Sequence, residues 1–368
     1  MTKQHIALFL PSLEGGGAER VMVNLARGFV EAGQRVDLVL VKAQGAYLEQ
    51  VPAQVNIVDL EAGRVVFSLF RLASYLRQAQ PDALLAAMDH ANVIAIIARL
   101  IAHVPTRIVV SVHSTLSIEV QKARNWRGRI LPAFIARLYP RAQAIIAVSS
   151  GVAEDLAAVT GVPLQKIQVI YNPVVTAELL RKSNAELAHA WFASGQPPVM
   201  LAVGRLSEQK DFTTLIRAFA LVRKQRPCRL IILGEGEQRN KLENLIAELD
   251  LQEDCALPGF VENPYAYMRR ADIFVLSSAW EGLVTVLIEA MACGTPVVST
   301  DCPSGSSEIL AAGKYGRLVP VGDYVALSGA VLESLDEKAD SALVMQRAGD
   351  FSQQASVRQY LALLTGAE

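Results

Sequence analysis

The sequence predicts an α/β protein made of two doubly wound domains, and three observations support this. The chain has 368 residues, too many for one ordinary hydrophobic core. Two series of short Val- and Ile-rich runs alternate with longer helical patterns. A polar stretch from about residue 172 to residue 198 separates the two series. Buried apolar runs of this kind are typical of parallel sheets covered by helices on both faces, where ligands bind at the carboxyl ends of the strands.

The first series forms the N-terminal domain, which we place at residues 1–175. Its predicted strands are residues 5–10, 35–41, 56–60, 83–87, 107–112, 144–148 and 166–170. Three separate helical patterns accompany these strands: one begins at Ala18, one ends at Leu76 and one begins at Ala91. Beta and alpha elements therefore alternate along this half.

The second series forms the C-terminal domain, which we place at residues 176–350. Its predicted strands are residues 199–203, 229–233, 255–257, 273–277, 296–300 and 316–320. The remaining segment, 351–368, predicts a terminal helix with Tyr360 as an aromatic anchor.

Composition narrows the class of protein. No apolar run reaches the roughly 18 residues of a membrane span, and the best candidate, residues 83–102, contains Asp89 and Arg99. The N-terminus lacks a signal-peptide pattern, and the four cysteines show no paired spacing, so we expect neither a zinc site nor disulfides. We therefore expect a cytoplasmic protein. The near-zero net charge gives no reason to expect a nucleic-acid partner.

One segment of the first domain is strongly basic and contains no acidic residue. Its basic residues are Lys122, Arg124, Arg127, Arg129, Arg137 and Arg141. Its second part places Leu131, Phe134, Ile135 and Leu138 at helical spacing. An apolar stripe beside positive charge is typical of a helix that docks on an anionic membrane, here the inner face of the cell membrane. A solvated basic helix packed on its own domain is the alternative.

Two glutamates separated by seven residues bracket the start of an apolar helix in the second domain. Glu281 follows the strand predicted at 273–277, and Glu289 lies within the helix. A buried carboxylate needs hydrogen-bond donors, which a sugar or a ribose diol can supply. Between the glutamates, Gly282 leads into the helix, whose first amides can attract a diphosphate. These amides belong to Leu283, Val284 and Thr285. The alternative is a structural helix with this spacing by chance.

Two cations follow the first strand of the second domain. Gly204 and Arg205 come directly after the strand, and Lys210 follows five residues later. Arginine can grip two phosphate oxygens, and lysine supplies a mobile positive charge. Together they would offset the charge that grows on a leaving diphosphate. Surface salt bridges are the alternative.

A glycine-rich turn joins the first predicted strand to its helix. Gly15, Gly16 and Gly17 precede Glu19, and glycines at a helix start allow a ligand to approach the backbone. The spacings G-x-G-x-x-G and G-x-x-x-x-G-K-[ST] are absent, which argues against a dehydrogenase or a P-loop nucleotidase. A turn that only lets the helix pack tightly is the alternative.

Three further positions lie at carboxyl ends of predicted strands. His113 ends the run 107–112, and His90 is the second candidate histidine; a histidine that merely ends a strand is the alternative. In the second domain, we expect Val261 to offer its backbone to a base and Gly234 to let the nucleotide lie against the chain.

Together these motifs resemble the retaining glycosyltransferases of family 4, the E-x7-E type of group 1. The resemblance covers nearly the whole chain and is strongest from residue 199 to residue 300. It implies the GT-B fold, in which two Rossmann-like domains face each other across a cleft and a C-terminal helix returns to the N-terminal domain. It also implies transfer of a hexose or N-acetylhexosamine from a nucleotide diphosphate sugar, UDP-linked, to an acceptor hydroxyl with retention.

The resemblance implies a role for each motif. The leaving diphosphate would be stabilised by Arg205, Lys210 and backbone amides, including those of Gly16, Val284 and Thr285. Glu289 would hold the ribose, Glu281 would orient the donor sugar, and His113 would lie near the anomeric carbon. The leaving phosphate would deprotonate the acceptor, with double displacement through Glu281 as the rival mechanism. The sequence shows no Asp-x-Asp metal site, so we expect no metal cofactor.

Residues 301–310 are similar to a subgroup that builds glycans or polysaccharides on polyprenyl diphosphate carriers. This implies a lipid-linked sugar as acceptor, which Glu19 and the basic residues from Lys122 to Arg129 could contact. The chain departs from the subgroup at Ser306, usually proline, and at Leu283 and Val284, usually Phe-Pro. A GT-B-like epimerase or hydrolase of the sugar nucleotide is the alternative, followed by a non-catalytic two-lobed sugar-binding protein.

Overall fold

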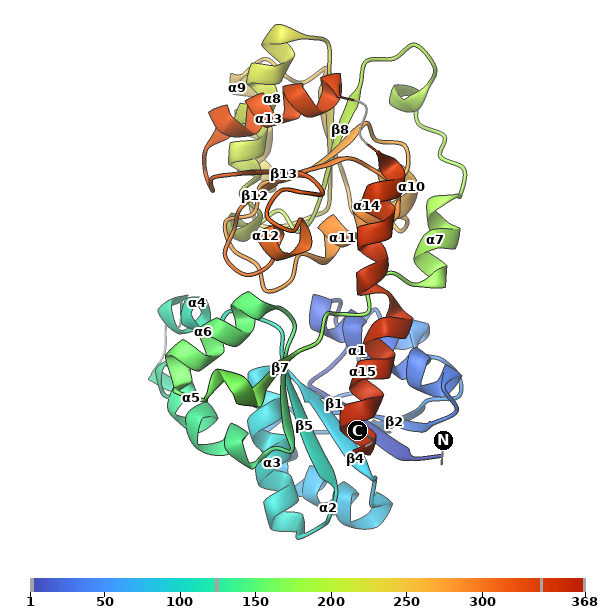
Figure 1. Cartoon of the computed structure of the whole chain (residues 1–368), viewed down its shortest axis with the longest axis vertical. Helices are drawn as coiled ribbons and strands as arrows, with labels where there is room; N and C mark the ends of the chain where they lie inside the picture. Colours follow the sequence, from blue (N-terminus) through green and yellow to red (C-terminus); the bar gives the residue numbers. More distant parts are fainter. Residues whose placement is uncertain (1–2, 123–125, 338–339, 367–368) are drawn as a thin grey trace. The chain divides into compact units, whose positions relative to one another are not determined.

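The computed structural model describes residues 3–122, 126–337 and 340–366, and the chain forms two compact units (Figure 1). The first unit comprises residues 1–174 and 353–368, and the second comprises residues 175–352. The chain therefore returns to its first unit after it has built the second.

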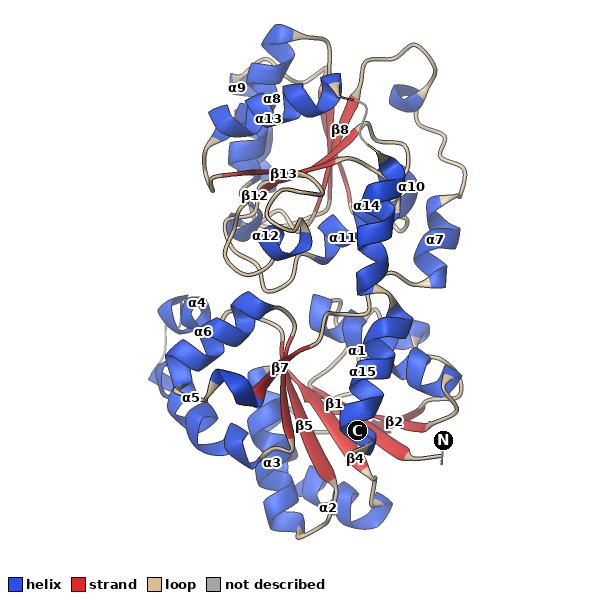
Figure 2. Cartoon of the chain, viewed as in Figure 1, coloured by secondary structure: helices blue, strands red, loops and turns tan. Residues whose placement is uncertain are grey.

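The first unit contains a seven-stranded parallel sheet with the order β3-β2-β1-β4-β5-β6-β7. Its strands are β1 (His5–Leu10), β2 (Arg35–Leu40), β3 (Asn56–Asp59), β4 (Ala83–Ala87), β5 (Arg107–Val112), β6 (Ala144–Ala147) and β7 (Ile167–Val169). The central strands β1 and β4 are buried almost throughout, because helices cover both faces of the sheet (Figure 2). The strand order reverses between β1 and β4, which is where doubly wound sheets bind ligands.

The helices of the first unit follow their strands in the expected alternation. They are α1 (Gly17–Glu31), α2 (Leu69–Ala79), α3 (Asp89–Ala102), α4 (Leu116–Lys122), α5 (Trp126–Leu138), α6 (Ser150–Thr160) and α15 (Gln353–Thr365), with the short 3-10 helices η2 (Val65–Ser68) and η4 (Leu164–Lys166). None of the helices in the described part of the chain is long and apolar enough for a membrane span.

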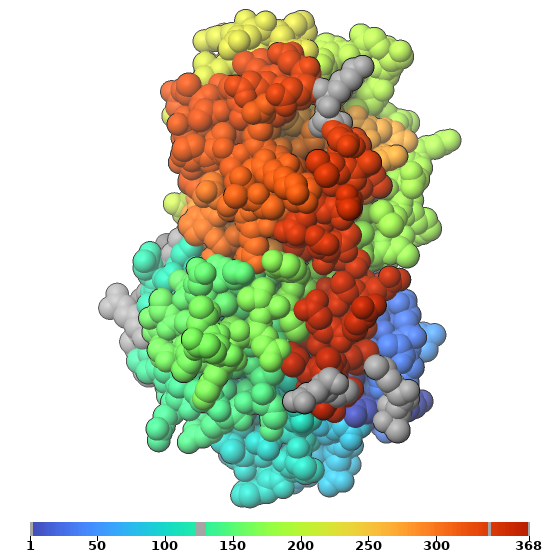
Figure 3. Space-filling model, in the orientation of Figure 1, coloured from blue at the N-terminus to red at the C-terminus, as the bar shows by residue number. Residues whose placement is uncertain are grey.

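The last helix, α15, is part of the core of the first unit. Val357, Tyr360, Leu361 and Leu364 pack in the same apolar cluster as α1 and β1. Gly28 of α1 allows this contact, because a Cβ there would lie 2.3 Å from Val357 Cγ2. In Figure 3 the red surface of α15 adjoins the blue surface of the N-terminal residues.

The second unit contains a six-stranded parallel sheet with the order β10-β9-β8-β11-β12-β13. Its strands are β8 (Val199–Val203), β9 (Arg229–Leu233), β10 (Cys255–Gly259), β11 (Ile273–Leu276), β12 (Val297–Thr300) and β13 (Arg317–Val319). Its helices are α7 (Ala177–Ser183), α8 (Phe212–Gln225), α9 (Arg239–Glu248), α10 (Pro264–Met268), α11 (Thr285–Ala292), α12 (Ser306–Ile309), α13 (Tyr324–Asp336) and α14 (Ser341–Ala348). Here the strand order reverses between β8 and β11.

The two doubly wound sheets confirm the predicted fold class, and three elements differ locally from the prediction. β10 extends to Gly259, past the predicted end at residue 257, through an irregularity in its pairing with β9. α3 begins at Asp89, because Met88 turns the chain with a φ of +77°. α11 begins only at Thr285, so Glu289 lies one turn into the helix, whereas the sequence suggested two.

The predicted membrane-docking residues fall mostly beyond what the structure describes. Arg124 lies outside the described residues, and the side chains of Lys122, Arg127 and Arg129 are not described either. The apolar stripe of α5 divides: Ile135 is buried in the unit, whereas Phe134 is 49% exposed.

Candidate active site

Two loops of the second unit, after β8 and after β9, lie against each other. The Gly204 amide donates to the Leu233 carbonyl and the Leu206 amide to the Glu235 carbonyl, both at 2.9 Å. Gly234 has a φ of +140°, and a Cβ there would lie 2.0 Å from the Gly204 carbonyl oxygen. Only glycine fits this position. Gly234 therefore permits a close approach to the Gly204 loop, and the nucleotide expected against this backbone stays a prediction.

Lys210 reaches across this loop to Glu281. It ends the 3-10 helix η6 (Glu208–Lys210), and a Cβ on Gly204 would lie 3.1 to 3.3 Å from three carbons of its side chain. Lys210 Nζ lies 2.5 Å from Glu281 Oε1, and the two side chains are only 16% and 9% exposed. The structure thus brings together two predicted catalytic residues that follow different strands, β8 and β11.

The Glu281 carboxylate has protein partners on both oxygens. Ser278 Oγ donates to Oε1 at 2.8 Å, the oxygen that Lys210 also contacts. Gln209 Nε2 donates to Oε2 at 3.3 Å and to the Trp280 carbonyl at 2.9 Å. A cation and neutral donors together compensate a buried charge, so Glu281 is held as an oriented carboxylate.

Hydroxyl groups at the ends of β11 and β12 fix the loop that carries Glu281. Ser277 Oγ donates to the Lys210 carbonyl, and Thr300 Oγ1 donates to the Ser278 carbonyl, both at 2.7 Å. These side chains are buried, so each unmade bond would leave a polar group unpaired. The sequence analysis missed this network, although the pairs Ser-Ser and Ser-Thr at the ends of otherwise apolar strands were the available signal.

The second glutamate and the start of α11 lie next to this loop in the chain. Glu289 is 3% exposed, and the Tyr265 hydroxyl lies 3.5 Å from its Oε1. The Thr285 amide donates to the Leu283 carbonyl at 2.9 Å. A turn at the helix start uses this amide in the structure, and its expected role toward a diphosphate stays a prediction. Val284 precedes the first turn of the helix and is buried.

Arg205 and Val261 have more exposed surroundings. The Arg205 guanidinium lies 3.2 Å from Glu237 Oε2, and its side chain is 75% exposed. Val261 is half-buried and follows Phe260, which is 80% exposed. The structure places Arg205 at the surface, held by an exposed carboxylate that a stronger anion could replace.

In the first unit, the glycine-rich turn is closed by its own helix. Glu19 Oε2 accepts hydrogen bonds from the Gly15 amide at 2.6 Å and from the Gly16 amide at 3.0 Å. Glu19 is the third residue of α1, so it caps its own helix start. The Gly16 amide is therefore occupied in this structure and Glu19 is 8% exposed within its own unit, and the donor and acceptor roles expected of them stay predictions. Around Gly17 a Cβ would meet no atom within 4 Å, so this backbone is open.

His113 follows β5 as predicted, and a hydrogen bond with Ser111 fixes its imidazole ring. Ser111 Oγ donates to the Ala86 carbonyl and lies 3.0 Å from His113 Nε2. Because the Ser111 proton is used, the imidazole carries its proton on Nε2, and Nδ1 is the free acceptor. Nδ1 is buried without a partner among the described residues. Burial lowers the pKa of His113 to about 4, so the ring is neutral near neutral pH.

A buried carboxyl that the sequence analysis did not select lies at the end of the neighbouring strand β4. Asp89 Oδ1 accepts from the Tyr139 hydroxyl at 2.7 Å, and Asn92 Nδ2 donates to that hydroxyl at 3.0 Å and to the Ser111 carbonyl at 2.9 Å. Burial raises the pKa of Asp89 to about 7, against the opposing hydrogen bond from Tyr139. This network connects the α3 start to the strand that carries His113.

The described residues offer little support for a metal site or for a reactive cysteine. Among residues 3–122, 126–337 and 340–366, no cluster of three or more His, Cys, Asp or Glu side chains could hold a metal ion. Metal-independent activity stays a prediction. The four cysteines are free and buried, and burial raises the pKa of Cys302 to about 11, so this thiol is protonated near neutral pH.

Comparison with known proteins identifies the family. Residues 184–351 match the model of group 1 glycosyl transferases, and residues 15–178 match the model of glycosyltransferase family 4. A Campylobacter jejuni protein is 31% identical over 328 residues, which cover 86% of either chain; it is named N-acetylgalactosamine-N,N'-diacetylbacillosaminyl-diphospho-undecaprenol 4-alpha-N-acetylgalactosaminyltransferase. The chain belongs to the group 1 glycosyltransferases.

Solved structures of other proteins resemble this glycosyltransferase over its full length. A glycosyltransferase from Rickettsia africae has a TM-score of 0.82 at 17% identity, covering 100% of this chain and 99% of the other. HepE from Anabaena in complex with UDP-glucose has a TM-score of 0.78 at 22% identity, covering 99% and 100%. These likenesses confirm the GT-B fold.

In this glycosyltransferase, only some of the predicted site residues contact one another. Lys210 and Glu281 are in contact, whereas Arg205 is paired with a surface carboxylate. Sequence reasoning missed Gln209 and Ser278, which bond to Glu281, because short polar residues in loops give no periodic signal.

Proposed function

We propose that this glycosyltransferase moves a hexose or N-acetylhexosamine from a UDP-linked donor to a hydroxyl of a lipid-linked sugar, with retention. The observation that carries the proposal is the buried Lys210–Glu281 pair, whose carboxylate also accepts a hydrogen bond from Ser278 at the carboxyl end of β11. Two features of similar proteins support it. The Campylobacter relative is named for a diphospho-undecaprenol-linked acceptor, and HepE was crystallised with UDP-glucose.

In the proposed reaction, the residues of the second unit bind the donor. Lys210 would exchange part of its contact with Glu281 for the diphosphate and offset the charge that develops on it. Arg205 would leave Glu237 for a phosphate in the same way, because a diphosphate is the stronger partner. Glu289 would accept hydrogen bonds from the ribose, and the Val261 backbone would face the base.

Glu281 is proposed to orient the donor sugar rather than to attack it. Its two oxygens already accept from Lys210, Ser278 and Gln209. A carboxylate bound by three donors is a weak nucleophile, because those bonds stabilise its charge. This favours a same-face reaction in which the leaving phosphate takes the acceptor proton. Trapping a sugar covalently on Glu281 would contradict it.

His113 is proposed to act as a neutral hydrogen-bonding group beside the reacting carbon. Its lowered pKa keeps the imidazole uncharged near neutral pH, so it would position a sugar hydroxyl rather than supply positive charge. No residue calls for a metal in this scheme, and we expect full activity in EDTA. We further propose that the enzyme works in the cytoplasm, at the inner face of the membrane that holds its acceptor.

The first test is the thermal stability of the protein with UDP, GDP, ADP and CMP. At about a hundred times the dissociation constant, a ligand adds about 2.7 kcal/mol of stability, a shift of a few degrees in Tm. We expect the shift for UDP, its loss in Glu289→Ala, and its retention in the control Glu253→Ala at an exposed position. No shift with any nucleotide would contradict the proposed donor class.

Measuring turnover of the sugar nucleotide with and without an acceptor separates the proposed transferase from the alternative functions. An epimerase or hydrolase would convert the sugar nucleotide without any acceptor. A sugar-binding protein would bind without converting it. We expect conversion that depends on an added acceptor.

A further inference from the structure

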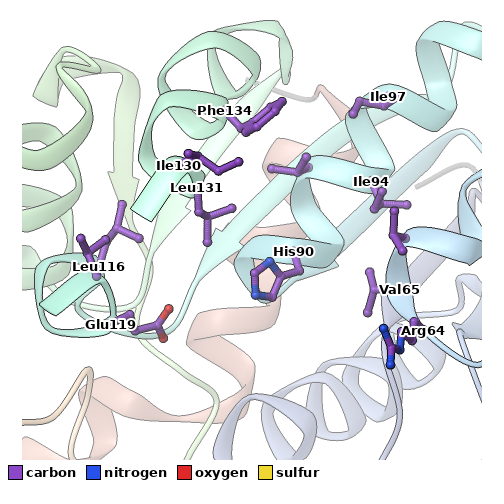
Figure 4. A pocket seen from close by; sticks show the side chains of 13 residues that line it. Arg64, Val65, His90, Ile94, Ile97, Leu116, Glu119, Ile130, Leu131 and Phe134 are labelled. Atoms are coloured by element: carbon purple, nitrogen blue, oxygen red, sulfur yellow. The ribbon is translucent and has the colours of Figure 1, made fainter. Parts of the chain in front are cut away.

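A large apolar pocket lies within the first unit and is lined by residues of that unit alone. It has a volume of about 730 Å³ and is formed by η2, α3, α4 and α5 (Figure 4). α3 starts where β4 ends, and α4 follows β5 and His113, so the starts of these two pocket helices lie at the same edge of the sheet as His113. Its volume falls within the range of about 300 to 1,000 Å³ that is typical of small-molecule sites.

The face of α3 that lines the pocket is apolar, with Ile94 buried and Val93 and Ile97 half-buried. Val93, Ile94 and Ile97 line the pocket at helical spacing. In Figure 4, Leu131 and Phe134 of α5 lie across from Ile94 and Ile97. Phe134 remains 49% exposed. Exposed apolar side chains gathered in a concave site indicate an apolar ligand.

Polar groups gather at one end of the pocket. In Figure 4, Arg64, His90 and Glu119 lie on one side, with His90 between the other two, while Ile97 and Phe134 lie on the opposite side. The Glu119 carboxylate accepts a hydrogen bond from Ser114 Oγ at 2.5 Å. The Arg64 side chain makes no ion pair with any residue that the structure describes. An uncompensated guanidinium beside an apolar cavity suits an amphiphile with a phosphate head.

We propose that this pocket binds the first isoprene units of a polyprenyl diphosphate carrier, with the diphosphate beside Arg64 and His90. The inference rests on the proposed lipid-linked acceptor and assigns the part of the enzyme that reads its lipid. Concave shape and a single polar end favour one bound chain over contact with a bilayer surface or with a second copy of the protein. The sugar, joined to the diphosphate, would then extend toward the sheet edge where His113 lies.

The test uses the full chain and three soluble probes, which are farnesyl diphosphate, geranyl diphosphate and inorganic diphosphate. Calorimetry should show saturable binding of farnesyl diphosphate. Geranyl diphosphate, one isoprene unit shorter, should bind at least about tenfold more weakly, because each missing methylene in an apolar pocket lowers affinity. Inorganic diphosphate should bind more weakly still.

Variants locate the binding. Phe134→Ser should weaken farnesyl diphosphate at least about tenfold. Arg64→Gln should weaken it but keep the preference for farnesyl over geranyl. Leu164→Ser, in η4 of the same unit and 45% exposed, is the matched control and should bind like the wild type. Equal affinity for all three probes, or equal weakening in the Leu164→Ser control, would overturn the proposal.

UDP binding measured in parallel separates the two proposals. If UDP raises Tm but farnesyl diphosphate does not bind, the pocket proposal is wrong and the donor assignment stands. If farnesyl diphosphate binds but no nucleotide does, the donor assignment is wrong and the pocket is a lipid site. If Phe134→Ser lowers pelleting with phosphatidylglycerol vesicles yet leaves farnesyl diphosphate binding unchanged, the surface faces a bilayer and the pocket proposal is overturned.

Discussion

Replacing Lys210 by methionine removes the cationic half of a buried ion pair while keeping most of the side-chain volume. Breaking such a pair from one side costs about 3 to 5 kcal/mol, because the remaining charge is left buried. Here Ser278 and Gln209 still donate to Glu281, so we expect about 3 kcal/mol, the lower end of that range. Adding Glu281→Gln removes the stranded charge, and the double variant should regain about 1 to 3 kcal/mol.

Urea unfolding followed by tryptophan fluorescence measures these changes. Trp191 and Trp280 lie in the second unit, and Trp280 is adjacent to Glu281 in the chain, whereas Trp126 belongs to the first unit. All proteins of the series therefore carry Trp126→Phe, so that the signal reports on the second unit. The midpoint should shift without a change in m. Lys182→Met is the control, because Lys182 pairs with Glu178 on the surface and should cost at most about 0.5 kcal/mol.

In these Lys210 and Glu281 variants, the loss of activity should not follow the loss of stability. Each variant that lacks Lys210 or the Glu281 carboxylate should lose at least about a hundredfold in kcat, including the double variant that regains stability. A double variant as unstable as the sum of the single variants would refute the coupling of the two residues. A Lys210→Met variant with ordinary turnover would refute the catalytic role.

Three further predictions address other parts of the molecule. Gly234→Ala should lower the free energy of unfolding by about 2 to 4 kcal/mol, because the new Cβ would clash with the Gly204 carbonyl. The control Gly322→Ala, which has open space around it, should lower it by about 1 kcal/mol, and equal losses in urea melts would contradict this. The Asp89 carboxyl binds its proton more tightly in the folded state, so its contribution to the free energy of unfolding is full below about pH 4 and is lost as the pH rises to about 7. Asp89→Asn should remove about 2 to 4 kcal/mol of this loss of stability between about pH 4 and about pH 7, and parallel wild-type and variant profiles of stability against pH would count against it. Replacing the basic residues before and within α5 by glutamine should weaken binding to anionic vesicles and leave the UDP-induced Tm shift intact; unchanged pelleting would exclude membrane docking by these residues, which are Lys122, Arg124, Arg127 and Arg129.

The sequence predicted the strands well because buried parallel strands are nearly continuous apolar runs. The predicted runs at residues 107–112 and 199–203 coincide with β5 and β8, since both are buried apolar runs with clear breaks at their ends. The breaks are Thr106 and His113 around β5, and Pro198 and Gly204 around β8. Short helices such as α10 were not predicted, because five residues are too few to show a helical period.

The candidate site was harder to predict where it depends on contacts distant in sequence. Loops after β8 and β11 could be expected at one sheet edge, but the sequence contains nothing that sets the direction in which Lys210 points. The sequence also did not predict the local partners of two loop positions. Glu19 and the Gly16 amide satisfy each other in a local cap, which competes with any ligand for the same donors.

The position of α15 has a consequence for how the protein is made. Four of its side chains complete the apolar core of the first unit, yet they are synthesised after all of the second unit. While the ribosome translates residues 175–352, the surface of α1 around Gly28 has no cover and must stay open to water. The first unit to leave the ribosome is therefore the last to be finished, and in the interval its bare apolar face is a natural target for chaperones.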